Sequence, residues 1–199
     1  MADLILIRHG QSVWNAANRF TGWTDVDLSE KGVLEAEQAG RDLSERRIDV
    51  VHTSDLIRSQ RTADIIMELN ECSDGAETRR DWRLNERNYG SLQGLNKAET
   101  AEKHGAEQVQ IWRRSYDVAP PDGESLEMTA RRTIPYFIEE ILPDLEAGKN
   151  VLVSAHGNSL RSIVMHIEGI SAEEIVSLEI PTGIPMPYIF EDGEIKRSD

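Results

Sequence analysis

Leu4-Ile5-Leu6-Ile7-Arg8-His9-Gly10 is the stretch that decides the fold: four consecutive apolar residues, one cation, then histidine and glycine. Val151-Leu152-Val153-Ser154-Ala155-His156-Gly157 follows a similar order much later in the chain. Apolar runs of four or five without alternation are typical of parallel strands that are covered on both faces. We therefore predict two buried strands that each end in His-Gly.

The rest of the chain alternates between helical and strand patterns. Val50-Val51-His52-Thr53 predicts a third strand, and Pro135 and Pro143 predict a kink or early end in one of the helices. The predicted helices are 29–46 with Ser29 as N-cap, 56–69 capped by Ser54 or Asp55, 126–145, and one that follows Gly157. This alternation predicts an α/β fold with a mostly parallel open sheet and helices on both faces.

The chain length of 199 residues predicts one domain, 1–199. Residues 83–125 interrupt the alternation, because they are polar, form only short helical patterns and contain Pro120-Pro121-Asp122-Gly123. We interpret this segment as a helical insertion that folds over the end of the sheet where a site would lie.

Composition excludes several classes of protein. The 36 acidic and 22 basic side chains give a formal net charge of −14, which argues against a nucleic-acid or anionic-membrane binder. The single cysteine, Cys72, excludes an intrachain disulfide and a multi-cysteine metal site. The apolar run at 4–7 is too short for a signal peptide or a membrane span. A reducing, cytoplasmic location is therefore expected.

The two His-Gly pairs are the first candidates for function. Ligands of open α/β sheets bind beyond the carboxyl ends of the strands, and a glycine there lets backbone approach a ligand. A lone histidine at a strand end is more often structural, but core packing gives no reason for the same arrangement twice. We therefore predict that His9 and His156 converge on one anionic group such as a phosphate.

Scattered charged residues are further candidates. Arginine side chains match phosphate and carboxylate oxygens in a bidentate way, although each could instead be an ordinary solvated cation. Glu86 could carry a proton or be a surface glutamate. The candidate cations are Arg8, Arg58, Lys97, Arg113 and Arg114.

Several segments together resemble the cofactor-dependent phosphoglycerate mutases, within the histidine phosphatase superfamily. The resemblance covers nearly the whole chain. Arg-His-Gly marks only the superfamily, whereas 86–97 and Arg113-Arg114 are similar to the mutases rather than to the plain phosphatases. The segments that carry it are 4–15, 18–23, 54–59, 84–97, 112–115, 123–126, 155–161 and 180–185.

The resemblance implies a catalytic mechanism. His9 would be the nucleophile that becomes phosphohistidine, with its other ring nitrogen donating to a backbone carbonyl. Arg8, Arg58 and His156 would surround the transferring phosphoryl group. Glu86 would move the proton of the substrate hydroxyl, which we expect to require a raised pKa.

The resemblance also implies ligands and partners. The reaction would convert 3-phosphoglycerate to 2-phosphoglycerate, as in glycolysis and gluconeogenesis, with 2,3-bisphosphoglycerate as cofactor and without a metal. The partner is thus a small phosphorylated molecule, while His52, His104 and His166 are expected to be structural or surface residues. The implied binding residues are Asn15, Thr21, Gly22, Tyr89, Lys97, Arg113, Arg114, Gly157 and Asn158.

Two departures from the family pattern leave questions open. Only residues 115–122 connect the Arg-Arg pair to the Gly-Glu-Ser-Leu motif, and only nine residues, 191–199, follow Phe190. The first leaves open whether the chain is a homo-oligomer, and the second leaves open the ratio of mutase to phosphatase activity. The alternatives are a phosphomonoester hydrolase that uses the same phosphohistidine with water, and a non-catalytic binding protein of the same fold.

Overall fold

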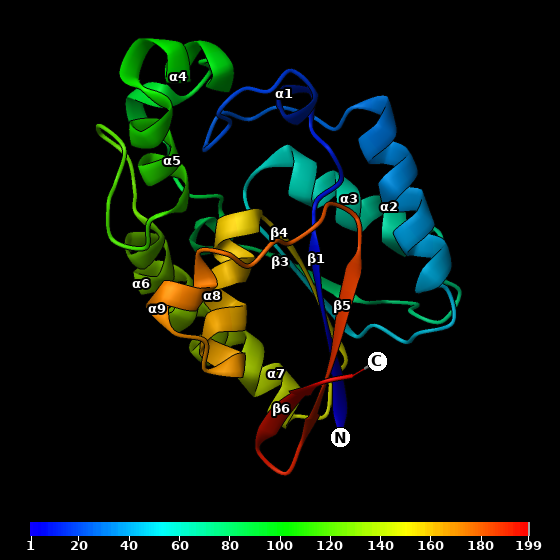
Figure 1. Cartoon of the computed structure of the whole chain (residues 1–199). Coiled ribbons are helices and arrows are strands. Elements are labelled where there is room, and N and C mark those ends of the chain that lie inside the picture. Colours follow the sequence, from blue (N-terminus) through cyan, green and yellow to red (C-terminus); the bar gives the residue numbers. More distant parts are fainter. Residues whose placement is uncertain (199) are drawn as a thin grey trace.

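The computed structural model describes residues 1–198, which contain one six-stranded sheet in the order β3-β2-β4-β1-β5-β6 (Figure 1). Strands β1 to β4 are parallel neighbours in this order, whereas β5 and β6 run antiparallel at one edge. The predicted mostly parallel open sheet is thus confirmed. The strands are β1 (Ala2–Arg8), β2 (Val50–Thr53), β3 (Glu77–Arg80), β4 (Val151–Ala155), β5 (Pro185–Glu191) and β6 (Glu194–Arg197).

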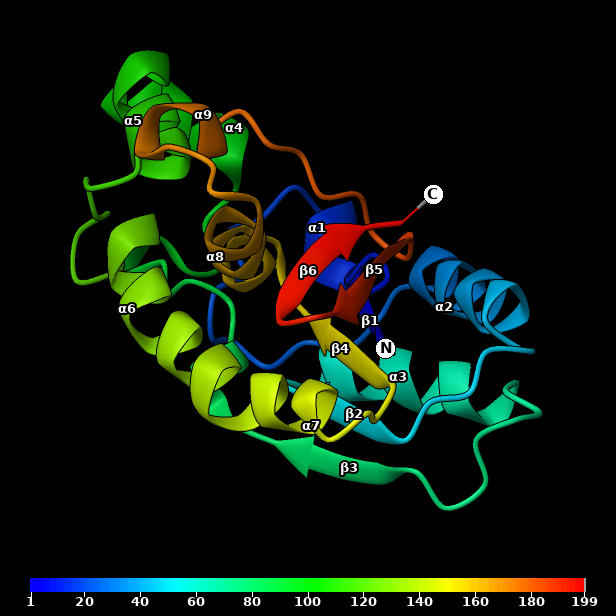
Figure 2. The ribbon, with the colours of Figure 1, turned by 90° about the horizontal axis from the view of Figure 1, so that it is seen from below.

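Helices cover both faces of the sheet (Figure 2). The longer ones are α2 (Glu30–Asp42), α3 (Ile57–Glu68), α4 (Lys97–His104), α5 (Ala106–Arg114), α6 (Leu126–Tyr136) and α8 (Gly157–Glu168). The short ones are α1 (Val13–Ala16), α7 (Leu142–Glu146) and α9 (Ala172–Ile175), with 3₁₀ turns at Trp82–Leu84 and Gly90–Leu92.

Strand β1 shows why its apolar run does not alternate. Leu4 and Leu6 pack in the core under α6 and α8, and Ile5 and Ile7 pack in the core under α2 and α3. All four side chains are at most 1% exposed. Because successive side chains of a strand point to opposite faces, both faces need apolar residues once both are covered.

The predicted helix starts are right in one case and wrong in another. Ser29 is the N-cap of α2, and its Oγ accepts a hydrogen bond from the Gly32 amide at 3.1 Å. Neither predicted cap of the next helix holds that position, because the N-cap of α3 is Leu56, which makes no capping bond through its side chain. The Ser54 hydroxyl instead accepts a hydrogen bond from the Leu56 amide, one residue before the helix begins.

The third helical pattern is divided into α6, one π-turn and α7, and its two prolines lie near the two junctions. Pro135 lies in α6, and Pro143 lies in the first turn of α7. Between them Phe137–Ile141 forms one wide turn of π-helix, with helical backbone angles on both sides. A π-turn shifts the hydrogen-bond register by one residue, so it can accommodate the amide that Pro143 lacks without ending the helix.

Strands β3, β5 and β6 were not predicted from the sequence. β3 is a polar edge strand, and β5 contains Pro185 and Pro187, which normally argue against a strand. β5 forms because Met186 and Tyr188, on its inner face, are buried against the sheet.

Residues 83–125, expected as an insertion, contribute α4 and α5. Figure 1 shows both helices beyond the carboxyl ends of β1 and β4, where α1 also lies. Within residues 1–198, none of the helices combines the length and the apolar character needed to cross a membrane.

Candidate active site

His9 and His156 lie side by side at the carboxyl end of the sheet. Each directly follows its strand, and β1 and β4 are adjacent with Arg8 opposite Ala155. The His9 amide donates to the Ala155 carbonyl at 3.0 Å, which extends the pairing by one residue. This register places the two ring centroids 4.9 Å apart with the planes tilted by 59°.

The imidazole of His9 is held in one tautomer. Its Nδ1 lies 2.6 Å from the Gly10 carbonyl, which can only accept, so Nδ1 carries the proton and Nε2 keeps a free lone pair. Burial, followed by the positive charges of Arg58 and Arg8, holds the pKa of His9 well below its ordinary value. The ring is therefore neutral near neutral pH and can act as a nucleophile.

His156 is fully buried and is anchored through its other nitrogen. Its Nε2 lies 2.7 Å from the Ser54 hydroxyl at the end of β2, and Nδ1 has no hydrogen-bond partner. Burial, and then the charge of Arg58, also keeps the pKa of His156 well below its ordinary value. Ser54 was not predicted as a site residue, although its place directly after β2 matches the places of the two histidines.

Arg8 and Arg58 flank the histidines and are held by backbone carbonyls. Arg8 donates to the Ile180 carbonyl at 2.8 Å, and Arg58 donates to the Gly22 and Thr24 carbonyls at 2.8 and 3.1 Å. Burial lowers the pKa of Arg58 to about 10, which leaves it protonated. Since carbonyls orient a guanidinium without cancelling its charge, both side chains remain available to an anion.

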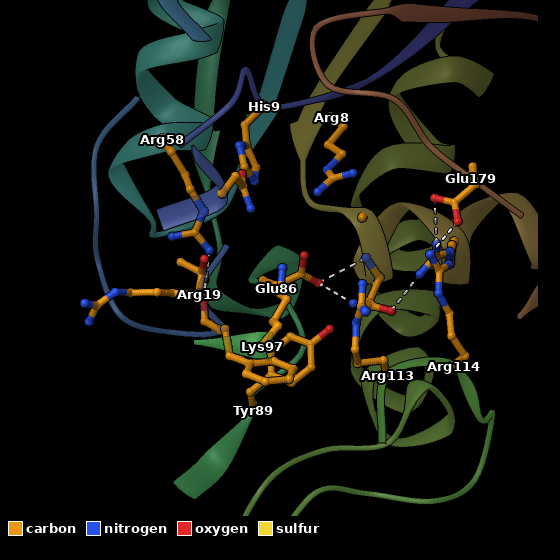
Figure 3. Close-up of a pocket in the computed structure, with 17 residues that line it drawn as sticks. Arg8, His9, Arg19, Arg58, Glu86, Tyr89, Lys97, Arg113, Arg114 and Glu179 are labelled. Atoms are coloured by element: carbon orange, nitrogen blue, oxygen red, sulfur yellow. Dashed lines mark hydrogen bonds and ion pairs between the residues drawn. The ribbon is translucent and has the colours of Figure 1, made fainter. Parts of the chain in front are cut away.

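Glu86 is buried beside these cations. Its Oε1 accepts hydrogen bonds from the amide and the side chain of Asn158, both at 3.0 Å (Figure 3). It also accepts one from the Arg87 amide at 2.8 Å. Burial alone would raise its pKa, but the charge of Arg8 and these three donors lower it below the ordinary value. The expected raised pKa is thus wrong for the protein without ligand, in which Glu86 is a carboxylate.

The insertion supplies the far side of the site. Lys97 begins α4, and Arg113 and Arg114 end α5. Burial lowers the pKa of Lys97. Burial would raise the pKa of Tyr89, but the nearby charge of Arg87, which also donates to the Tyr89 hydroxyl at 3.1 Å, lowers it.

The loop before α2 supplies the rim. Gly22 has φ +56°, where a side chain is strained, and a Cβ there would come within 2.1 Å of Gln93 Oε1, so glycine is favoured. The Thr21 hydroxyl is buried without a partner. Asn15 lies in α1, where its Oδ1 accepts a hydrogen bond from the Ser12 amide at 3.1 Å.

These residues line one cavity of about 200 Å³. All predicted site residues except His156 line it, and His156 is fully buried with its ring next to that of His9. Four lining residues were not predicted from the sequence, namely Arg19, Phe20, Arg161 and Glu179. Arg161 could have been found, because it follows Gly157 by four residues and so lies on the same helix face.

The other three histidines lie outside this cavity. His52 is buried between Tyr136 and Asp144, while His104 packs against Trp112 and His166 against Phe137. Among residues 1–198, no group of three His, Cys, Asp or Glu side chains could hold a metal ion.

Comparison with known proteins identifies a matching family model and similar sequences. The family model described as "Histidine phosphatase superfamily (branch 1)" matches residues 4–193. The "2,3-bisphosphoglycerate-dependent phosphoglycerate mutase" of Protochlamydia amoebophila is 48% identical, with 98% of this chain and 97% of that protein covered. The similarly named mutase 1 of Arabidopsis thaliana is 50% identical, and the match covers 98% of this chain and 66% of that longer protein.

Solved structures share the fold. A mycobacterial glucosyl-3-phosphoglycerate phosphatase complexed with VO3 matches with a TM-score of 0.85 at 25% identity, covering 100% of this chain and 98% of that one. A Bacillus stearothermophilus protein, YhfR, has the same TM-score of 0.85 at 22% identity, covering 100% and 96%.

Proposed function

This chain belongs to branch 1 of the histidine phosphatase superfamily, and within it to the 2,3-bisphosphoglycerate-dependent phosphoglycerate mutases, and from this we propose that His9 is its phosphoryl carrier. The enzyme interconverts 3-phosphoglycerate and 2-phosphoglycerate through a phosphohistidine. The observation that carries the assignment of His9 is its neutral ring, with Nε2 free, beside His156 and two buried arginines.

The polar atoms of the cavity fit a ligand with several anionic groups. Arg8 Nε, Arg58 Nε, Arg114 Nη1 and Thr21 Oγ1 are buried and have no hydrogen-bond partner within the protein. Buried donors without partners are costly, and phosphate or carboxylate oxygens would satisfy them. When bound, 2,3-bisphosphoglycerate supplies the phosphoryl group that loads His9.

His9 attacks phosphorus through Nε2. A phosphorus–nitrogen bond forms while the bond from phosphorus to the leaving oxygen breaks. Arg8 and Arg58 stabilise the charge on the phosphoryl oxygens during this transfer, a role that metal ions fill in other phosphoryl-transfer enzymes. His156, neutral and with Nδ1 unpartnered, adds a polar group beside the same oxygens.

Glu86 moves the proton. When phospho-His9 transfers its group to a substrate hydroxyl, the phosphorus–nitrogen bond breaks, a phosphorus–oxygen bond forms, and the hydroxyl proton passes to Glu86. The ionised state of Glu86 in the ligand-free protein suits it to accept this proton. Oε1 already accepts three hydrogen bonds, so Oε2 is the proton-carrying atom. The return transfer to His9 restores the proton to the leaving oxygen.

The remaining lining residues bind the parts of the substrate that do not react. Lys97, Arg113 and Arg114 lie across the cavity from His9 (Figure 3) and pair with the carboxylate and the second phosphate. The rest of the bound substrate is contacted by Tyr89, Thr21 and the backbone at Gly22 and Gly157. The side-chain amides of Asn15 and Asn158 are further hydrogen-bond donors. Oriented binding at both ends keeps the reacting hydroxyl in line with phospho-His9.

The reaction proceeds without a metal in this proposal, since guanidinium groups supply the positive charge. We place the enzyme in the cytoplasm and treat residues 1–199 as one domain with an insertion at about 83–125.

Phosphoryl trapping tests the proposal. The enzyme is incubated with 2,3-bisphosphoglycerate that carries labelled phosphate, and the acid-labile label is located by peptide mapping. We expect the label on His9, and we expect 3-phosphoglycerate to be converted to 2-phosphoglycerate in a ³¹P NMR assay that depends on the same cofactor.

His9→Ala supplies the negative arm and His104→Ala the matched control, because His104 is exposed on α4 and lies outside the cavity. His9→Ala should lose both the label and the isomerisation with an unchanged circular dichroism spectrum. Isomerisation at the ordinary rate by His9→Ala would remove the covalent mechanism, and release of free phosphate without 2-phosphoglycerate would show a hydrolase instead.

A further inference from the structure

One carboxylate at the mouth of the cavity has no part in the mechanism. Glu179 lines the cavity and forms ion pairs with Arg114 Nη2 and, at 3.7 Å, with Arg161 Nη2 (Figure 3). Resting on the function proposed above, we propose that Glu179 competes with the anionic end of the ligand for Arg114. It would thereby set how readily the doubly phosphorylated ligand leaves.

The backbone holds Glu179 at this position. On one side of it, the Leu178 carbonyl accepts from Arg161 Nε at 2.7 Å, and on the other the Ile180 carbonyl accepts from Arg8 Nη1 at 2.8 Å. Both arginines line the cavity, so the segment is fastened to the site directly before and after Glu179. The carboxylate is therefore placed at the cavity mouth by the fold and does not reach it from a free loop.

The pairing of Arg114 differs from that of the two arginines beside His9. Arg8 and Arg58 are oriented by backbone carbonyls and keep their charge, whereas Arg114 is neutralised by a carboxylate. Its second terminal nitrogen, Nη1, is buried and has no partner. Arg114 thus pairs with Glu179 through Nη2, and Nη1 is available to another anion.

The pair can be displaced by a ligand. The Glu179 side chain is 68% exposed, and ion pairs with an exposed partner contribute only about 0–1 kcal/mol. A phosphate near neutral pH carries about two negative charges and more acceptor oxygens than a carboxylate. The ligand therefore wins the competition for Arg114, but its binding is weaker than it would be without Glu179.

The effect should grow with ligand charge. A phosphoglycerate carries about three negative charges and the bisphosphate about five, because each phosphate adds about two. Coulomb energy is proportional to charge, so removing Glu179 should strengthen binding of the bisphosphate most. For Glu179→Gln at low salt we expect the Kd of 2,3-bisphosphoglycerate to fall by about tenfold and that of 3-phosphoglycerate by about fourfold.

Glu194→Gln is the matched control. Glu194 is 67% exposed and pairs with Lys196 on β6, outside the cavity, so the substitution removes the same charge from an equally exposed, ion-paired carboxylate. Binding is measured by calorimetry in proteins that also carry His9→Ala, which cannot take up the phosphoryl group. Turnover is measured in proteins with His9 intact.

The expected result is tighter binding in Glu179→Gln alone, with a lower KM for the cofactor and a kcat that does not rise. The gain should become smaller when Arg114→Gln is combined with it, since the competition for Arg114 is then absent and only direct repulsion between Glu179 and the ligand remains. Weaker binding in Glu179→Gln would overturn the inference by showing that Glu179 positions Arg114. An equal gain in Glu194→Gln, or a gain that is undiminished without Arg114, would also overturn it.

The wild-type arm separates this inference from the proposed function. If the wild-type enzyme fails to isomerise 3-phosphoglycerate in the presence of the bisphosphate, the proposed function is wrong. If the wild type is active and binding in Glu179→Gln equals that in Glu194→Gln, only the inference about Glu179 is wrong.

Discussion

Gly10 offers a sharp test of how the nucleophile is positioned. A Cβ at this residue would lie 2.2 Å from the Gly32 carbonyl oxygen and 2.8 Å from its carbon, both in the backbone of α2. Since ordinary carbon–oxygen contacts are about 3.2 Å or longer, Gly10→Ala forces the two segments about 1 Å apart. The carbonyl of Gly10 accepts from His9 Nδ1, so this movement also displaces the imidazole.

The expected cost has two parts. A displacement of about 1 Å in a reacting group typically costs on the order of a hundredfold in kcat. Overpacking of this kind also costs about 1–3 kcal/mol of unfolding free energy, which for a chain of this length lowers Tm by roughly 2–12 °C. Both are measured on the same protein, kcat by the ³¹P NMR isomerisation assay and Tm by calorimetry.

Gly75→Ala separates the loss of stability from the loss of activity. Gly75 has φ +79°, and a Cβ added there would meet no atom within 4 Å, so alanine costs about 1 kcal/mol of backbone strain far from the cavity. We expect a lower Tm with unchanged kcat. If Gly10→Ala keeps kcat within about twofold of wild type, the argument that Gly10 positions His9 is refuted.

Three further predictions concern acids, bases and salt. Glu86→Gln should lower kcat by roughly a hundredfold or more in the isomerisation assay, and an unchanged rate would show that another group moves the proton. In the wild type, the apparent pKa on the acid side of the kcat/KM profile should lie below the ordinary pKa of a glutamate, because the pKa of Glu86 is lowered. The apparent pKa on the acid side of the kcat profile should be higher, because bound phosphates raise the pKa of Glu86. Equal apparent pKa values in the two profiles would contradict this. Burial lowers the pKa of His52 to about 4, below its ordinary value of about 6.5. Its contribution to the free energy of unfolding, up to about 3 kcal/mol, should therefore be complete above about pH 6.5 and be lost as the pH falls towards 4. In chemical denaturation, the free energy of unfolding of His52→Gln should depend less on pH than that of the wild type.

The strands that position the site could be predicted because burial on both faces leaves a strong pattern. β1, β2 and β4 each contain a run of buried apolar residues, and His9, Ser54 and His156 directly follow these strands. β5 could not be predicted, because Pro185 and Pro187 weaken its local pattern, and it is stabilised by pairing with β1 and β6 and by the burial of its inner face. Long-range pairing overrides local propensity there.

The residues of the candidate site also differ in how far they could be predicted from the sequence. Arg8 ends β1, and His9 and His156 follow strands, so these three could be placed from the sequence, whereas the roles of the insertion residues came from family resemblance. The pKa of Glu86 could not be predicted, because its sign depends on Arg8 and Asn158, which come from distant parts of the chain. Glu179 leaves no sequence signal, since only tertiary structure brings it to Arg114.

Two histidines in nearly the same backbone setting acquire different chemistry because different nitrogens are anchored. His9 is bound at Nδ1 by a carbonyl, which fixes a proton there and leaves Nε2 as a lone pair. His156 is bound at Nε2 by the Ser54 hydroxyl and leaves Nδ1 without a partner. A hydroxyl can donate or accept, so only His9 has its nucleophilic form imposed by the fold. Ser54→Ala should therefore slow turnover without preventing phosphorylation of His9, and a variant that cannot be labelled at His9 would show that the two rings act as one unit.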